Sequence, residues 1–401
     1  MVKFSGLIFL LFLCLTSHAQ DNRDHTPARI WIDAYLESIK EDGFGPTIHS
    51  RNLFHLSIAL YDSWEIYNGE ALNTVFVGKT LGGYNCVFDS FEIPENRDSA
   101  MNVTMHYTAF RFIAGRFSEY GSKNRTMDAL INRFDSLVID RGDHSLDYSG
   151  GSAAALGNYI ADQLLQFGLQ EPAGDADGYE GVMYNPVNPA MRPDLPGVQT
   201  LPYKNRWQPL AILPYIKSKG WDKTLKDWNN VLIQHEDVFL TPHWGEITPF
   251  AMGNEQKSIM SREGNNFNVY NDPGPPPFMG KDQVNNAEYA WNFMLVSSWG
   301  AHNDPNDATR IDISPSSIGT TKGILPRTFE EYKAFFSLEE GGCKTLPLKK
   351  NPKTRKNYAK NMVKRGDYSR VIAEYWVDGV NTLSPPGHWL SIFNEVCDDP
   401  N

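Results

Sequence analysis

Cysteine is scarce in this sequence, which has four among its 401 residues. Cys14 lies in an apolar run at the N-terminus, so the rest of the chain holds Cys86, Cys343 and Cys397. Three is an odd number, so at most one disulfide forms, between two cysteines that the sequence does not specify, and one thiol stays free. No two of the three are close enough in sequence for a zinc knuckle, and at least one is expected to be a small buried apolar residue.

The sequence also lacks an excess of positive charge. It has 37 Lys and Arg against 48 Asp and Glu, which gives a formal net charge of -11. A nucleic-acid partner would require a basic face. The one dense basic run, residues 349–360, is typical of a solvated loop or helix face. We therefore expect no nucleic-acid partner.

Long apolar runs are absent beyond the first residues. The segment from Leu7 to Leu15 is apolar, follows Lys3, and leads to the small residues Ser17 and Ala19. This pattern predicts a signal peptide over residues 1–19, cleaved after Ala19, although an uncleaved N-terminal anchor is the alternative. Later stretches are shorter than the roughly 20 apolar residues of a transmembrane helix. The mature chain, residues 20–401, is expected to be soluble, without a membrane span, and secreted or periplasmic.

Strand-like alternation is weak, and helical periodicity dominates. Apolar stripes predict helices at 32–39, 53–67, 127–137, 156–167, 287–299 and 367–377, with a further helix through Leu390, Phe393 and Val396. Thr47 or Ser50 is the expected N-cap of the second helix, whereas the fourth follows Gly150-Gly151-Ser152 and is expected to stop at Gly168. Helices with one apolar stripe must bury it on each other, so the predicted fold class is all-α, a helical bundle.

Long irregular stretches separate these helices, notably residues 171–215 and 271–280. Loops of this length in a compact protein are functional or form ordered covering segments. The first stretch contains four aromatic residues, Tyr179, Tyr184, Tyr203 and Trp207, and such a content favours ordered packing. We therefore expect long irregular loops that cover the bundle.

The densest polar cluster lies around Arg51 and His55. These residues are four apart, so they share one helix face. They could contact an anionic substrate, or they could belong to a buried polar network that joins this helix to its neighbours. Leu53, Leu56 and Leu60 mark the same helix as part of the core, which favours the buried network.

Other candidate metal ligands have unfavourable spacing. His235 and His243 are eight apart, with Pro242 between them, whereas two ligands on one helix face are four apart. Two acidic clusters, Asp175/Asp177 and Asp304/Asp307/Asp312, lack the ligand order of a calcium-binding EF-hand. Asx turns explain these clusters without an ion. The sequence contains no nucleophile elbow and no phosphate-binding loop.

Several strings, taken in order, resemble the secreted vanadium-dependent haloperoxidases, relatives of the type 2 phosphatidic acid phosphatases. They are PTIHSRNLFHLS at 46–57 with YDSW at 61–64, NRWQPL at 205–210, TPHWG at 241–245 with TPF at 248–250, IDISP at 311–315, and WVDG at 376–379 with PPGHW at 385–389. The resemblance covers nearly the whole mature chain, from about Ile30 onward. It implies an enzyme that holds vanadate, or phosphate in the phosphatases, with a Lys, two Arg, a Ser hydroxyl, a Gly amide and a His, while a second His binds the metal or attacks phosphorus. Positive donors suit such an oxyanion.

The three motifs that carry those donors in the family do not occur in this chain. In the first, a Lys precedes an Arg-Pro pair by seven positions, but Asn185 occupies that position before Arg192-Pro193. The second is Pro-Ser-Gly-His, and at Pro385–His388 the hydroxyl is replaced by Pro386. The third is Ser-Arg, three residues, Gly, one residue and His. Ser50-Arg51 and His55 resemble it but lack its Gly and its spacing. The resemblance therefore assigns no catalytic, cofactor-binding or metal-binding residue.

The resemblance implies that residues 20–401 form the helical N-terminal region of a haloperoxidase-like protein whose catalytic C-terminal part is absent. Vanadate is the cofactor of the full-length family, and none is expected for this chain alone. The expected partner is the absent catalytic region, and a homodimer is left open. We also expect the last predicted helix to expose an apolar face. The alternatives are a secreted acid phosphatase of the same superfamily, a non-catalytic exported scaffold or binding protein, and an unrelated metal site using His235, His243 or His388.

Overall fold

The structure is a computed structural model. It describes residues 25–41, 45–69, 71, 73–117, 123–137, 139–177, 179, 186–191, 201–209, 241, 243–262, 264–274, 276–278, 283–317, 325–338, 341–343, 348–377 and 382–398. The helices are α2 (Pro27–Glu41), α3 (Pro46–Asn68), α4 (Arg97–Phe117), α5 (Lys123–Ser136), α6 (Ala153–Gln170), α8 (Gln283–Gly300), α9 (Phe329–Phe335), α10 (Arg365–Tyr375) and α11 (Ser384–Asp398). No helix in these ranges combines the length and apolar character needed to cross a membrane.

The predicted all-α class is confirmed in its coarse form, because the described chain is mostly helical. It also contains three short antiparallel pairs that the sequence did not indicate. These pairs are β1 (Thr80–Leu81) with β2 (Tyr84–Asn85), β3 (Ser258–Arg262) with β4 (Asn265–Val269), and β5 (Arg310–Asp312) with β6 (Met362–Lys364). The helix pairing described below, and not a sheet, therefore builds the core.

Local sequence explains where the predicted helices begin and end. The Ser152 hydroxyl caps α6 by accepting a hydrogen bond from the Ala155 amide at 3.2 Å. The helix runs through Gly168 and ends at Gln170, two residues beyond the predicted stop. The predicted cap of α3 is wrong: Gly45 is the N-cap and Pro46 starts the helix, so Thr47 and Ser50 lie inside it.

Helix α4 was not predicted from the apolar pattern, because polar residues interrupt its buried face. Thr104 and Thr108 are fully buried and hydrogen bond to Tyr67 at 2.8 Å and Ser63 at 3.0 Å in α3. The same part of α4 packs closely on α6, where a Cβ atom at Gly157 would lie 2.6 Å from the Tyr107 Cβ. Buried hydroxyl pairs take the place of apolar side chains on this face of α4. The sequence of the helix therefore lacks the regular apolar spacing by which a helix is predicted.

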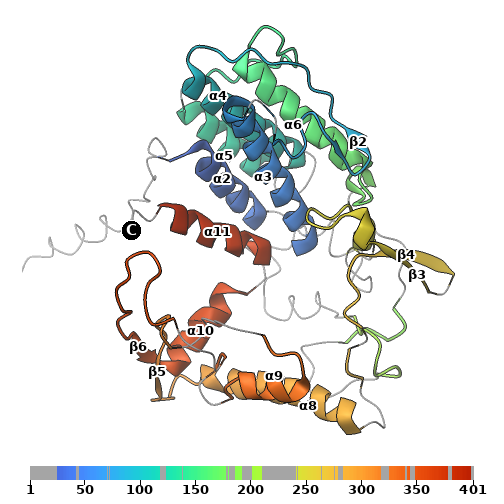
Figure 1. Cartoon of the computed structure of the whole chain (residues 1–401), viewed down its shortest axis with the longest axis vertical. Helices are drawn as coiled ribbons and strands as arrows, with labels where there is room; N and C mark the ends of the chain where they lie inside the picture. Colours follow the sequence, from blue (N-terminus) through green and yellow to red (C-terminus); the bar gives the residue numbers. More distant parts are fainter. Residues whose placement is uncertain are drawn as a thin grey trace, which may run out of the picture.

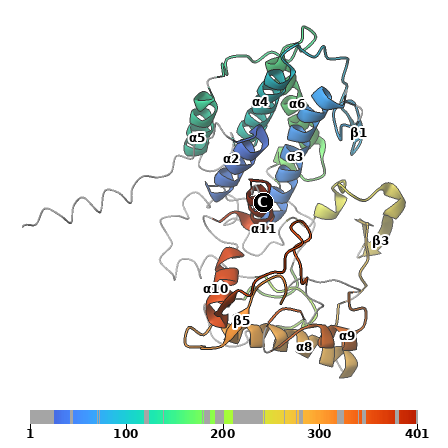
Figure 2. The same ribbon diagram turned by 60° about the vertical axis from the view of Figure 1, so that its left-hand side comes forward.

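Helices α2 to α6 gather into one group, whose core includes Trp31, Tyr35, Phe112, Phe134 and Leu156. A second group contains α8, α9, α10 and the β5–β6 pair, and Figures 1 and 2 both place it below the first. Helix α11 lies between the two groups, against α2 and α3. Two polar contacts fix it to α2: Arg29 with Glu395 at 2.9 Å, and Asn394 with Asp33 at 3.0 Å.

Candidate functional site

The polar cluster predicted from the sequence forms a buried charged network at one end of α3. Arg51 and His55 lie one helical turn apart, and both face Glu171, the residue that follows α6. The Arg51 guanidinium donates two hydrogen bonds to the Glu171 carboxylate, with the Nε–Oε2 pair at 3.0 Å. The His55 Nε2 lies 3.3 Å from the Glu171 Oε2. Two side chains of α3 thus converge on one carboxylate.

A second arginine and a second carboxylate complete this network. Arg116 of α4 lies 3.3 Å from the Nδ1 atom of His55 through one guanidinium nitrogen, and it pairs with Asp175 through another. Arg116 cannot give up its proton, so it donates to His55 and keeps the Nδ1 atom unprotonated. The network therefore links α3, α4 and the segment after α6 through His55.

Burial dominates the protonation of this network. It lowers the pKa of His55 to about 4, and Glu171 opposes this shift only in part. Burial alone would raise the pKa of Glu171, but the hydrogen bonds from His55 and Arg51 outweigh it, so that pKa is lowered. At neutral pH the network therefore contains two guanidinium groups, two carboxylates and a neutral imidazole.

This network does not fit vanadate or phosphate. Each arginine already has its own carboxylate, so the five side chains have no net positive charge for an oxyanion. The rings of Phe54, Phe112 and Phe167 pack against its cationic side chains and its histidine, and His55 is buried. Arg51 and His55 thus belong to the buried network that the sequence favoured.

Of the alternative histidine metal site, which the spacing disfavoured, the structure describes only His243. The Nε2 of His243 lies 2.8 Å from the carbonyl oxygen of Ala173, so His243 is bonded to the backbone of the segment after α6. His235 and Glu236 lie outside the described residues, as do Asn185 and Arg192-Pro193. Within the described ranges, no group of three His, Cys, Asp or Glu side chains is arranged to hold a metal ion.

The second acidic cluster forms Asx turns, as its sequence suggested. Asp304 accepts from the Asn306 amide at 2.8 Å, Asp307 from the Thr309 amide at 2.9 Å, and Asp312 from the Ser314 amide at 3.0 Å. In the first cluster, Asp175 pairs with Arg116, a contact that the sequence analysis missed. The sequence around Asp175 is typical of a turn, and nothing in it indicates that the carboxylate pairs with a buried arginine of another helix.

The near-match to the second oxyanion motif forms the first turn of α11. Gly387 packs against α2, where a Cβ atom would lie 3.0 Å from the Leu36 Cδ2. The His388 ring packs at a tilt against Tyr375 and Trp376, with ring centroids 4.7 Å and 5.4 Å apart. Both ring nitrogens of His388 and the Ser384 hydroxyl are buried, and none has a hydrogen-bond partner in the described structure. This turn joins α10, α11 and α2 but leaves three polar atoms unsatisfied.

Cys86, Cys343 and Cys397 form no disulfide with one another. Cys86 is buried, as the sequence suggested for at least one of them, and burial raises the pKa of its thiol to about 11. Cys343 is partly buried and Cys397 is exposed. The thiol of Cys86 is therefore protonated and unreactive at neutral pH.

Comparisons with protein-family models, curated proteins and solved structures gave no match to this chain.

Proposed function

We propose that this chain is the helical framework of a secreted vanadium-dependent haloperoxidase-like protein, and that halide oxidation requires an oxyanion-binding region outside these 401 residues. In this proposal α2 to α6 and α11 form the helical bundle, and the long segments between helices cover it. The region that binds vanadate, and peroxide with it, is the partner of this framework.

The places that the resembling strings take in the structure support this proposal. The string at 46–57 joins the segment at 241–250, because Thr47 and Thr241 hydrogen bond at 3.0 Å and Phe54 packs on Phe250 at 5.3 Å. In the string at 61–64, the Asp62 carboxylate accepts hydrogen bonds from the amides of Val75, Phe76 and Val77. Asp62 thus fixes the segment after α3 to the helix, a structural role that fits a framework.

The other strings also make structural contacts. The backbone of the 205–210 string is held by Asn188, whose side-chain amide donates to the carbonyls of Arg206 at 3.0 Å and Trp207 at 3.1 Å. Asp312 of the 311–315 string accepts a hydrogen bond from the Asn361 amide at 2.9 Å. Trp376 and Trp389 of the last string pack at 5.3 Å. The first two of these strings are thus bonded to segments outside them, and the two parts of the last string pack on each other.

The surface of α11 is the observation that carries the proposal. Its residues Trp389, Phe393 and Val396 are 65%, 60% and 66% exposed and lie on one helix face, at spacings of four and three. Exposed apolar residues in such a row mark an interface. An apolar helical region of the longer product would cover this row.

The test compares the 401-residue chain with the product of the whole gene, sequenced beyond codon 401. We expect a downstream reading frame with the three oxyanion motifs. The 401-residue chain should not oxidise bromide with vanadate and peroxide, whereas the longer product should. In the longer product, hydrogen exchange at residues 389–396 should be slower.

Three outcomes would contradict the proposal. A stop codon directly after codon 401 would favour a non-catalytic exported scaffold or binding protein. Bromide oxidation by the 401-residue chain that is lost in the His388→Ala variant would place the active site in α11. Phosphatase activity of the longer product, without halide oxidation, would favour the acid phosphatase alternative.

A further inference from the structure

The basic run of the sequence forms a short hairpin, residues 349–358, which we call the basic hairpin. Backbone hydrogen bonds join its two arms, from the Asn351 amide to the Lys356 carbonyl at 2.9 Å and from the Tyr358 amide to the Lys349 carbonyl at 3.3 Å. In Figure 1 it is part of the loop that leads into β6. The hairpin therefore brings the basic residues of both arms next to each other.

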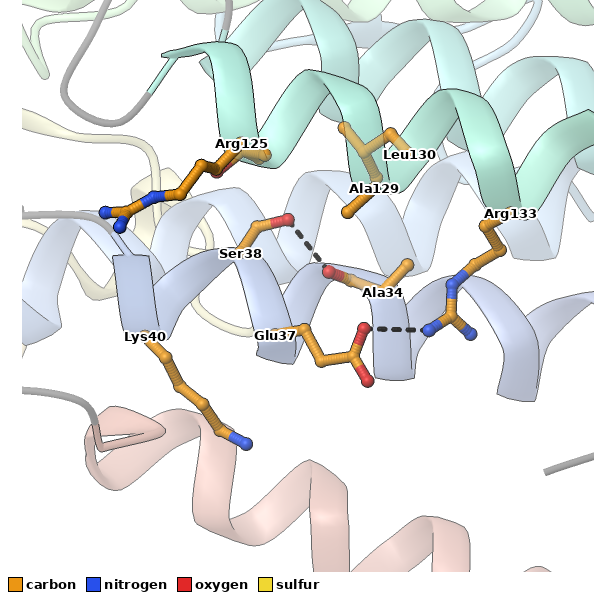
Figure 3. Close-up of a pocket in the computed structure, with 9 residues that line it drawn as sticks. Ala34, Glu37, Ser38, Lys40, Arg125, Ala129, Leu130 and Arg133 are labelled. Atoms are coloured by element: carbon orange, nitrogen blue, oxygen red, sulfur yellow. Dashed lines mark hydrogen bonds and ion pairs between the residues drawn. The ribbon is translucent and has the colours of Figure 1, made fainter. Parts of the chain in front are cut away.

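All the charges of the basic hairpin have the same sign. Its charged residues, all exposed, are Lys349, Lys350, Lys353, Arg355 and Lys356. None of these five groups pairs with a carboxylate in the part of the chain that the structure describes. By contrast, Arg133 in the groove between α2 and α5 pairs with Glu37 at 2.7 Å, as Figure 3 shows. The hairpin is therefore a concentrated positive patch without its own counter-charge.

This patch stands out against the rest of the chain. Without the five residues, the sequence has 32 Lys and Arg against 48 Asp and Glu, a net charge of -16. Cations held close together repel each other, and each attracts counter-ions from solution. A polyanion that lies along the hairpin replaces this repulsion with attraction and releases the counter-ions, which favours binding most at low salt.

Two features of the chain favour one kind of polyanion. From residue 349 to residue 361 no exposed side chain is aromatic or large and apolar, whereas single-stranded nucleic acids stack their bases on aromatic rings and membrane-bound segments insert apolar side chains. The negative charge of the rest of the chain also opposes contact with an extended anionic surface such as a membrane. A linear polymer with anionic groups can contact the hairpin alone.

From this arrangement we infer that the basic hairpin binds a linear anionic polysaccharide. The lysine and arginine side chains donate charge-assisted hydrogen bonds to its sulfate or carboxylate groups. This inference does not rest on the proposed function, because the hairpin lies outside the resembling strings and outside α11.

The test is calorimetric titration of the 401-residue protein at low salt with dextran sulfate, polygalacturonate and neutral dextran. Single-stranded DNA and vesicles of phosphatidylserine and phosphatidylcholine in equal parts are separate probes. At least one of the two anionic polysaccharides should bind more tightly than the DNA and the vesicles, and neutral dextran should not bind. The difference between dextran sulfate and polygalacturonate distinguishes a sulfate ligand from a carboxylate ligand. Added salt should weaken the binding.

A triple variant tests whether the basic hairpin is the binding surface. Lys349→Gln/Lys353→Gln/Lys356→Gln removes three of its five charges and keeps polar side chains at these exposed positions. It should weaken binding of the preferred polysaccharide by at least about fivefold, because each exposed ion pair contributes a modest share of the affinity.

The matched control removes the same number of charges away from the hairpin. Lys40→Gln/Lys204→Gln/Lys257→Gln changes three exposed lysines of other segments and should bind the polysaccharide like the unmodified chain. Equal weakening in the two triple variants would overturn the inference, because net charge alone would then determine the affinity. No binding of either anionic polysaccharide would also overturn it, as would DNA or vesicles that bind at least as tightly.

Discussion

A buried charge is stable only when an opposite charge lies beside it, and Glu171 supplies that charge for Arg51. Glu171→Gln would leave the buried guanidinium without a counter-charge. We expect this variant to lower the free energy of unfolding by about 3–5 kcal/mol, measured by urea denaturation at pH 7. The matched control is Asp135→Asn, which breaks the exposed ion pair with Arg141 and should cost at most about 1 kcal/mol. A loss below about 1 kcal/mol for Glu171→Gln would show that the network contributes little to stability.

Buried neutral histidines predict an acid-sensitive fold. Burial lowers the pKa values of His55 and His106 to about 4, from an ordinary value of 6.5. Between these values the unfolded chain binds protons that the folded chain does not. Stability is therefore complete above about pH 6.5 and falls as the pH decreases toward 4, by up to about 1.4 kcal/mol per pH unit for each histidine.

His106 allows this prediction to be tested without disturbing the charged network. Its Nδ1 accepts a hydrogen bond from the Trp31 indole at 2.9 Å, and a glutamine amide could accept the same bond without titrating. In urea denaturation at pH 7 and pH 5, His106→Gln should lose less stability between the two pH values than the unmodified chain. His144→Gln, at an exposed position, should lose as much as the unmodified chain. Equal losses in all three proteins would disprove the role of His106.

At the residue scale, the sequence predicted which side chains share a helix face, but it did not predict which distant side chains they bond to. The four-residue spacing of Arg51 and His55 placed them on one face, and the leucines around them indicated burial. Nothing in the sequence connected them to Glu171 and Arg116, which are 120 and 61 positions from Arg51 and His55 respectively. Such pairs depend on how helices meet, and a single sequence does not encode that as a local pattern.

At the scale of elements, α11 is a helix with one packed face and one uncovered face. Phe393→Lys/Val396→Lys replaces two exposed apolar side chains, and should reduce self-association of the 401-residue chain in light scattering while leaving its melting temperature unchanged. The matched control is Leu390→Lys, because Leu390 packs against the core. That change should lower the free energy of unfolding by at least about 1 kcal/mol. If the double variant instead unfolds the protein, Phe393 and Val396 are packed against the rest of the chain and not exposed.

Helices with a regular apolar stripe were predicted from the sequence, and α2, α3, α5, α6, α8, α10 and α11 all lie where such stripes occur. Helix α4 was missed because Thr104 and Thr108 occupy its buried face as hydroxyl pairs. The β3–β4 pair was missed because its strands are largely exposed and show no alternation of burial. Periodicity reveals an element only when one of its faces is consistently apolar.

At the scale of the whole molecule, the two helix groups differ in how completely they are buried. The core of α2 to α6 is continuous, whereas α8 keeps Phe293, Met294 and Val296 exposed while Trp291 and Leu295 on its other side are buried. Fold class followed from the sequence because it depends on many residues together. The arrangement of the two groups did not, because it depends on a few contacts, such as those of Trp376 with His388 and Trp389.

The bonds that α11 makes to α2 also determine when the fold can be completed. Arg29 and Glu395 are 366 positions apart, and Asp33 and Asn394 are 361 apart. At ordinary rates of translation, ribosomes need on the order of tens of seconds to synthesise the intervening polypeptide. Throughout that interval Leu36 and Ile39 of α2 lack the covering turn at Gly387. In a nascent chain of this protein, that side of α2 therefore stays without its cover until a segment far downstream has been synthesised.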